Sequence, residues 1–153
     1  MSRSIPLRLT LQIQQDVLRV LIQNPTGHEV RVWDLGNSWG GASWSLRLIV
    51  DSAAGSKLTL RPANQAYSRN LPRFIEVPAY GHKELRLAPS GPEWTAGENL
   101  TPLRGAPIHV QAVLEIAPSP EAMEHDVATG LVESAEELSQ PPHSWLFGST
   151  TAR

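Results

Sequence analysis

Hydrophobic and polar residues alternate with a period of two along much of the chain, a pattern typical of half-buried β-strands. The clearest run is 108–116, where every second residue is apolar and His109, Gln111, Val113 and Glu115 occupy the opposite face. Other segments predict further strands by the same pattern: 7–13, 18–22, 30–33, 44–50, 57–60, 74–77, 82–87 and 127–132. Only 120–125 and 134–138 have a helical composition, and each is under two turns long. The chain is therefore predicted to be all-β with little helix.

Turn residues separate these segments and set their spacing. The chain has 13 Pro and 11 Gly, and Asn24-Pro25-Thr26-Gly27 suits a type I turn in which the Asn side chain caps the turn. About eight or nine short strands with frequent turn signals favour an antiparallel β-sandwich, with a closed barrel as the alternative. We expect one sandwich domain over 1–138 and a C-terminal arm over 139–153, whose Trp145, Leu146 and Phe147 would pack on the body or insert into a partner.

Two segments carry a resemblance to known modules. RFIEVPAYGHKELRLAP, residues 73–89, resembles the strand–turn–strand of immunoglobulin-like and fibronectin type III-like domains, and LRVLIQNPTGHEVRVW, residues 18–33, resembles an early hairpin of bacterial immunoglobulin-like domains. The resemblance implies an immunoglobulin-like sandwich that binds or supports other molecules. It implies no catalytic residues.

Charge is distributed unevenly between the two halves of the chain. Residues 1–76 have nine basic and five acidic side chains, a balance of +4, whereas residues 77–153 have four basic and ten acidic ones, a balance of −6. No Lys or Arg lies between Gly105 and Ala152. An acidic segment without counter-charges is a candidate docking surface for a basic partner, or else a solvated surface. Its proposed binding residues are Glu121, Glu124, Asp126, Glu133, Glu136 and Glu137.

A tryptophan-rich segment at 33–44 is the second candidate binding site, and three of the five tryptophans fall in it. Trp44 shares a face with Leu46 and belongs to the predicted core. Trp33 is expected to face outward or lie under a loop, unless a bulge reverses it. Exposed tryptophans beside polar residues suit a protein interface or a sugar ring, and a loop plug is the structural alternative. The proposed binding residues here are Trp33, Asp34, Asn37 and Trp39.

Several classes of chemistry find no support in the sequence. The absence of cysteine excludes disulfides, thiolate zinc sites and a thiol nucleophile. The five histidines show no metal-ligand spacing, and Glu124-His125-Asp126 would alternate in direction on an extended chain. There is no Gly-x-Ser-x-Gly elbow and no phosphate-binding loop. We therefore expect no enzyme activity, no metal and no cofactor.

These observations predict a protein-binding module. A net charge of −2 and no long apolar run argue against nucleic acid and membrane as partners, and no signal peptide is recognisable, so a cytoplasmic location is expected. The leading hypothesis is an immunity-type inhibitor that neutralises a basic protein such as a toxin. The alternatives are a carbohydrate- or small-ligand-binding module that uses the 33–44 loop, and a structural homo-oligomer subunit.

Overall fold

The computed structural model describes residues 5–14, 17–33, 46–53, 55–61, 74–87 and 100–147, without the side chains of Phe74 and Glu121. These residues form short strands joined by turns, with little helix. The helices are α1 (Pro120–Glu124), α2 (Ser144–Phe147) and the 3-10 helix η2 (Thr101–Leu103). The strands are β1 (Arg8–Gln14), β2 (Val17–Gln23), β3 (Val30–Trp33), β4 (Leu46–Ser52), β5 (Lys57–Leu60), β6 (Phe74–Val77), β7 (His82–Leu87), β8 (Ile108–Ile116), β9 (Gly130–Glu133) and β10 (Glu137–Ser139).

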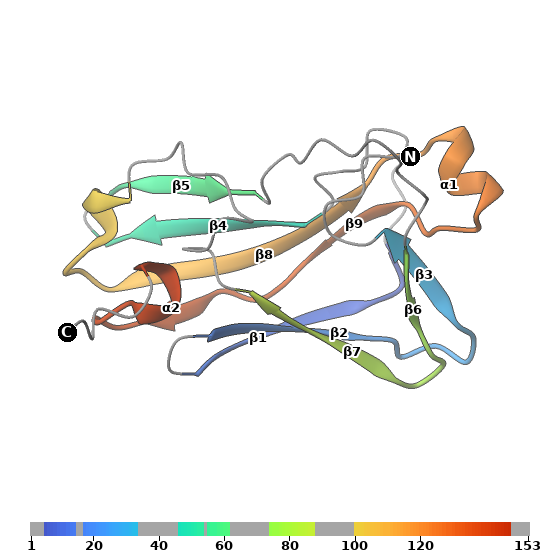
Figure 1. The fold of residues 1–153 in the computed structure, drawn as a ribbon, viewed down its shortest axis with the longest axis horizontal. Helices are drawn as coiled ribbons and strands as arrows, with labels where there is room; N and C mark the ends of the chain where they lie inside the picture. Colours follow the sequence, from blue (N-terminus) through green and yellow to red (C-terminus); the bar gives the residue numbers. More distant parts are fainter. Residues whose placement is uncertain are drawn as a thin grey trace, which may run out of the picture.

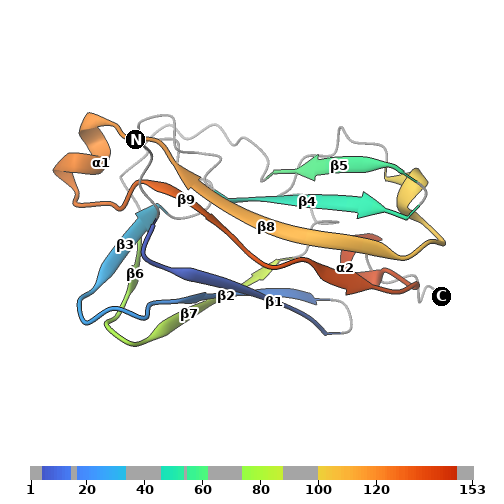
Figure 2. The same cartoon turned by 180° about the vertical axis from the view of Figure 1, so that it is seen from behind.

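The strands pair antiparallel in three sheets, which confirms the predicted all-β fold. One sheet has the order β1-β2-β7, a second has the order β10-β8-β4-β5 with β9 also on β8, and β3 pairs with β6. The larger sheet lies over the three-stranded one, and the two meet along one side where β1 runs beside β9 and β10 (Figures 1 and 2). The finer immunoglobulin-like topology stays a prediction.

The core lies between the two larger sheets and follows the alternation in the sequence. Leu18 and Val20 of β2 are 0% exposed, as are Leu48 of β4 and Val110 of β8. Complete burial of each such side chain stabilises the fold by about 1.5–3 kcal/mol before entropy is subtracted. Val113, expected on the outer face of β8, is also buried, at a position paired with Arg47 and Glu133.

The chain that follows β10 packs into this core. Trp145 and Leu146 of α2 are 1% and 0% exposed, and α2 lies against β2. The expectation that the apolar end of the chain packs on the body is thus met for 139–147. The predicted boundary at residue 139 remains untested, and β10 runs across it.

A corner joins the β2–β7 pair to the β3–β6 pair, which rises toward α1 (Figure 1). Asn24, 2% exposed, holds this corner from inside. Its side-chain amide donates to the carbonyls of His28 (2.8 Å) and Val77 (3.0 Å), and its Oδ1 accepts the Thr26 N–H (2.9 Å). The predicted capping of this turn by Asn24 is confirmed, and the same side chain also bridges to the end of β6.

Two predicted elements near the acidic segment differ from the structure. Residues 134–138 form no helix, because Ser134 bonds to β8 and β10 begins at Glu137. The predicted strand 127–132 is shorter, since Asp126 has φ +57°, Val127 bridges Arg31 of β3, and β9 starts only at Gly130. The helix predicted at 120–125 is present as α1, capped where Ser119 Oγ accepts the Ala122 N–H (3.0 Å).

No helix within the described ranges is long and apolar enough to cross a membrane.

Candidate functional site

The acidic segment 130–139 forms one edge of the larger sheet, interrupted by a β-bulge. Val113 of β8 pairs with Glu133, but Val110 pairs with Glu137, so the edge chain has one residue more than its partner. Ser134, 3% exposed, fixes the bulge: its N–H donates to the Ala112 carbonyl and its Oγ accepts the Ala112 N–H, both at 2.9 Å. A bulge shifts the side-chain alternation by one residue. Odd-numbered residues before this bulge, such as Glu133, therefore share a face with even-numbered residues after it, such as Glu136.

This shift divides the three glutamates of the edge. Glu133 pairs with Val113 on the outer face of the sheet, and Glu136 lies on the same face, with its Oε2 3.7 Å from Nδ1 of His109. Glu137 instead pairs with the core-facing Val110 and remains exposed only because it lies at the sheet edge. The structure therefore brings Glu133 and Glu136 to one face and places Glu137 on the other.

Two half-exposed leucines accompany the carboxylates on the outer face. Leu131 pairs with the exposed Glu115 and is 41% exposed, whereas Leu138 pairs with His109 and is 50% exposed. We call Leu131, Glu133, Glu136 and Leu138 the acidic edge. Apolar side chains flanked by charges are the composition of a protein interface, in which leucines supply buried area and carboxylates supply orientation.

Within the stretch 106–151, which itself has no Lys or Arg, Glu115 of β8 gains a counter-charge from another part of the chain. Arg47 of β4 forms an ion pair with Glu115 across the sheet, at 2.9 Å from NH1 to Oε1. Within the described part of the chain, Glu133 has no ion-pair partner, and Glu136 has only His109. Glu133 is thus an exposed carboxylate without an ion pair among the described residues, as are Glu124 and Asp126 at the end of α1.

The remaining acidic candidates lie elsewhere. Glu124 and Asp126 are exposed at the end of α1, which lies at the opposite end of the long axis from α2 (Figure 1). The Glu121 side chain is outside the described residues. Because Glu137 lies on the other face of the sheet, the five carboxylates whose side chains are described do not form a single surface.

Trp33 is buried, so of the two expected placements, facing outward or lying under a loop, the structure has the second. Its side chain is 1% exposed, and its ring meets that of His125 edge-on at 6.2 Å. The chain after α1 runs beside β3: Arg31 NH1 donates to the His125 carbonyl (3.1 Å), and the Ala128 N–H donates to the Arg31 carbonyl (2.8 Å). This segment buries a strand position that alternation alone assigns to the surface. The other candidates of the tryptophan-rich loop, Asp34, Asn37 and Trp39, lie outside the described residues.

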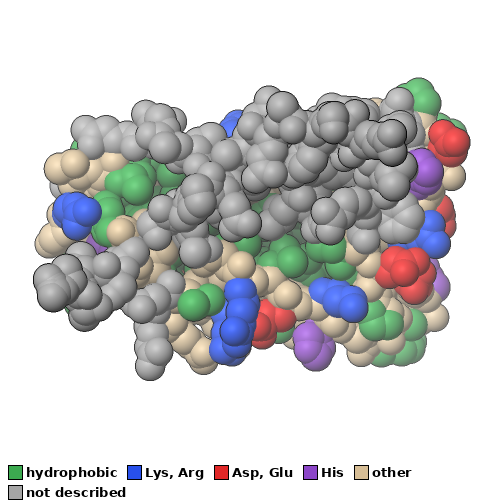
Figure 3. Space-filling model, viewed as in Figure 1, with side chains coloured by type: hydrophobic (Ala, Val, Ile, Leu, Met, Phe, Trp, Pro, Cys, Tyr) green, Lys and Arg blue, Asp and Glu red, His purple; other side chains and the backbone are tan. Residues whose placement is uncertain are grey.

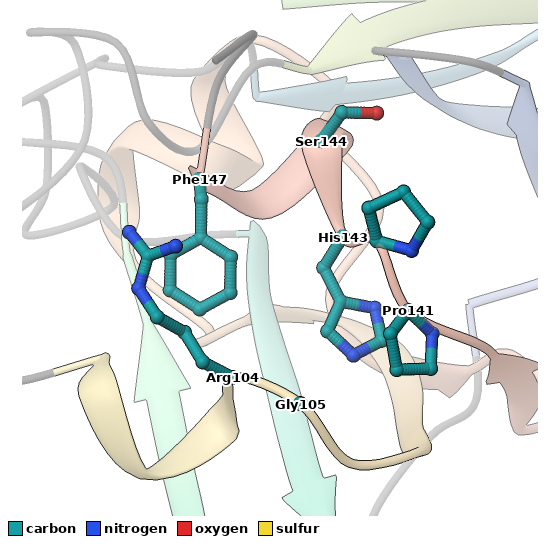
Figure 4. Close-up of a pocket in the computed structure, with 7 residues that line it drawn as sticks. Arg104, Gly105, Pro141, His143, Ser144 and Phe147 are labelled. Atoms are coloured by element: carbon teal, nitrogen blue, oxygen red, sulfur yellow. The ribbon is translucent and has the colours of Figure 1, made fainter.

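A small pocket of about 260 Å³ lies beside α2, between Arg104, the Pro141–Pro142 turn and Phe147 (Figure 4). The Arg104 guanidinium lies 3.9 Å above the centre of the Phe147 ring, a cation–π contact. His143 is 4% exposed, with Nε2 2.7 Å from the Ala106 carbonyl and Nδ1 3.4 Å from Ser139 Oγ. Because a carbonyl only accepts, Nε2 carries a proton, and in the neutral imidazole Nδ1 is then the acceptor for the Ser139 hydroxyl.

Ser139 completes a buried hydrogen-bond chain, since its Oγ also accepts the Trp145 Nε1–H at 3.0 Å. Both imidazole nitrogens of His143 are engaged, and its Nε2–H donates to a backbone carbonyl where a catalytic triad would use a carboxylate. These hydrogen bonds hold the C-terminal arm in place. Sequence reasoning missed it because no local motif connects Ser139, His143 and Ala106.

No group of three or more metal-ligating side chains occurs among the residues that the structure describes. No family model, curated protein or solved structure matches the chain.

Proposed function

We propose that this chain is a non-enzymatic protein-binding module whose acidic edge contacts a basic partner. The observation that supports the proposal is the composition of the edge: Glu133 lacks a counter-charge in the described part of the chain, and Leu131 and Leu138 are 41% and 50% exposed beside it. An inhibitor of a basic toxin, of the immunity type, is the form of this function that the charge of the edge fits best.

The carboxylates and the leucines would act at different stages of binding. Unpaired carboxylates steer a basic partner toward the edge and raise the association rate, an effect that salt weakens. The leucines bury apolar surface when the complex forms, and this burial mainly slows dissociation. The outer face is held by a sheet and a bonded bulge, so few groups would have to be ordered on binding.

The test is affinity capture from the native cell with three versions of the chain: the unaltered chain, Glu133→Lys/Glu136→Lys, and a matched control, Glu124→Lys/Asp126→Lys. The two variants each replace two acidic residues by lysine, so they have the same net charge and differ only in where the charge is reversed. We expect a basic protein to bind the unaltered chain and the control but not the edge variant.

A titration with the captured protein then gives the energetic test. Two charge reversals at an interface are expected to weaken binding about tenfold to a hundredfold and to reduce the dependence of affinity on salt. Equal capture by the edge variant, or an unchanged salt slope, would rule out this role for the edge.

A further inference from the structure

The last strand of the three-stranded sheet, β7, has an outer side that no strand covers among the described residues. The sheet order is β1-β2-β7, so β7 pairs on one side only. His82, Lys83, Glu84 and Arg86 are exposed, and charged side chains of both signs lie together at the surface over the lower sheet (Figure 3). An uncovered strand edge offers its backbone groups to another strand.

Hydrogen bonding at the corner shows which backbone groups of β7 face outward. The Asn24 N–H donates to the Gly81 carbonyl at 2.9 Å, in the same register that pairs Ile22 with Lys83 and Val20 with Leu85. In an antiparallel ladder, residues exchange hydrogen bonds at every second pair. Lys83, Leu85 and Leu87 therefore direct their N–H and C=O groups at β2, whereas His82, Glu84 and Arg86 direct theirs away from the sheet.

This arrangement restricts how a second copy of the chain can add to β7 around a twofold axis. Outward-directed residues must face each other, so the axis must pass through a single residue of β7. An axis at Glu84 opposes two carboxylates, an axis at Arg86 opposes two guanidinium groups, and an axis at Lys83 opposes two ammonium groups. An axis at Leu85 instead places Glu84 opposite Arg86 of the second copy, twice.

We propose that two copies of this chain associate by antiparallel pairing of their β7 strands, with the twofold axis at Leu85. Of the four registers compared, this one opposes no like charges. Glu84 and Arg86 already lie on one face, joined within the chain by a 3.1 Å ion pair, and can exchange partners across the interface. Leu85 is half-buried on the inner face. At the axis it lies opposite Leu85 of the second copy in a non-hydrogen-bonded pair, the type of pair in which opposed side chains approach most closely.

This interface is separate from the acidic edge, which belongs to the other large sheet. Charged residues on an edge strand often prevent association. Here Glu84 meets Arg86 of the second copy at both symmetric positions, and Lys83 meets Leu87, so no like charges oppose each other on this exposed strand.

The test is sedimentation velocity of the full chain at concentrations up to about 1 mM, which covers weak association. We expect a concentration-dependent dimer. Glu84→Arg and Arg86→Glu, made singly, should each raise the dimer dissociation constant about tenfold or more, because each opposes like charges at two symmetric positions. The double variant Glu84→Arg/Arg86→Glu exchanges the two signs and should restore the dimer.

Lys57→Glu is the matched control, because it reverses an exposed charge on β5, the terminal strand of the other sheet, and should leave the dimer unchanged. Thermal unfolding of each variant establishes that it is folded. A chain that stays monomeric at about 1 mM overturns the proposal, and so does a dimer that neither single reversal weakens. Because β7 is outside the acidic edge, these variants should still capture the basic partner, so the two proposals fail independently.

Discussion

The corner around Asn24 and the acidic edge both redirect a strand, but they use their polar groups in opposite ways. At the corner, the Asn24 side chain is 2% exposed and hydrogen-bonds to backbone groups of both turns. At the acidic edge, the buried Ser134 bonds to the Ala112 backbone and its carbonyl accepts from Gln111 Nε2 (3.1 Å), while Glu133, Leu131 and Leu138 remain at the surface. The corner therefore supports the fold, while the edge leaves groups available for a partner.

The two turns of the corner also constrain each other. The Tyr80 N–H donates to the Thr26 carbonyl (3.0 Å), and the Gly81 N–H donates to the Pro78 carbonyl (2.9 Å). Tyr80 has φ +56°, a left-handed conformation that is rare for a bulky residue. We infer that the corner tolerates few substitutions, whereas the edge tolerates many.

The largest effect should come from Asn24→Ala at the corner. It leaves the buried Val77 carbonyl and the Thr26 N–H without their side-chain partner, and the free energy of unfolding should fall by about 3 kcal/mol. Urea unfolding of the purified chain measures this. The exposed neighbour Gln23→Ala is the control and should cost under about 0.5 kcal/mol. A loss below about 1 kcal/mol for Asn24→Ala would mean that the corner is not held from inside.

Gly81→Ala should have the next largest effect. A Cβ at this position would lie 2.6 Å from Pro78 Cγ and 3.2 Å from the Pro78 carbonyl oxygen. A proline ring and a backbone carbonyl have little freedom to move, so we expect a loss of about 2 kcal/mol in unfolding free energy. Gly27→Ala is the matched comparison, because its Cβ would meet only the hydroxyl end of the exposed Tyr80 at 3.1 Å. Equal losses for the two glycines would contradict the idea of a rigid corner.

Ser134→Ala should lower stability by about 1 kcal/mol, since the buried Ala112 N–H loses its acceptor while the backbone bond from Ser134 remains. Thermal unfolding measures the loss, and each 1 kcal/mol corresponds to about 2–4 °C in Tm for a chain of this size. Ala135→Ser, at an exposed position of the same bulge, is the control and should leave Tm unchanged. A Tm drop for Ser134→Ala as large as that for Asn24→Ala would remove the distinction between the two regions.

The smallest effect on stability is expected for Glu133→Lys/Glu136→Lys. Exposed charges contribute little to folding, so the unfolding free energy should stay within about 0.5 kcal/mol of the unaltered chain. The same denaturant titration measures it. A loss above about 1 kcal/mol would show that these carboxylates support the sheet, and reduced capture by this variant would then be explained by unfolding.

Strand positions were predictable from the sequence where each strand has one buried face. Alternation in 7–13 and 108–116 identified β1 and β8, and the runs around residues 20 and 85 identified β2 and β7. Burial of the inner face imposes a period of two on the chain, so the pattern is visible locally. The turn chemistry of Asn24 was visible for the same reason, because its Oδ1 bonds two residues ahead.

The candidate site was predictable only as a region of composition. The absence of Lys and Arg between Gly105 and Ala152 located the acidic segment, but the bulge at Ser134 decided that Glu133 and Glu136 share a face and that Glu137 does not. The burial of Trp33 was likewise not visible in the local sequence. The segment that covers it lies almost a hundred residues later, around His125, whose carbonyl accepts a hydrogen bond from Arg31.

The sequence by itself determined that the chain is all-β, where most strands lie, and that its acidic charge gathers in the second half, because periodicity and composition are local properties. Tertiary structure alone decided which carboxylates lie together, that Arg47 neutralises Glu115, that Trp33 is buried, and that Ser139, His143 and Trp145 hold the C-terminal arm. Each of these depends on strand register or on contacts between distant segments. Register is set by the packing of the whole sheet, and a shift of one residue moves a side chain to the opposite face.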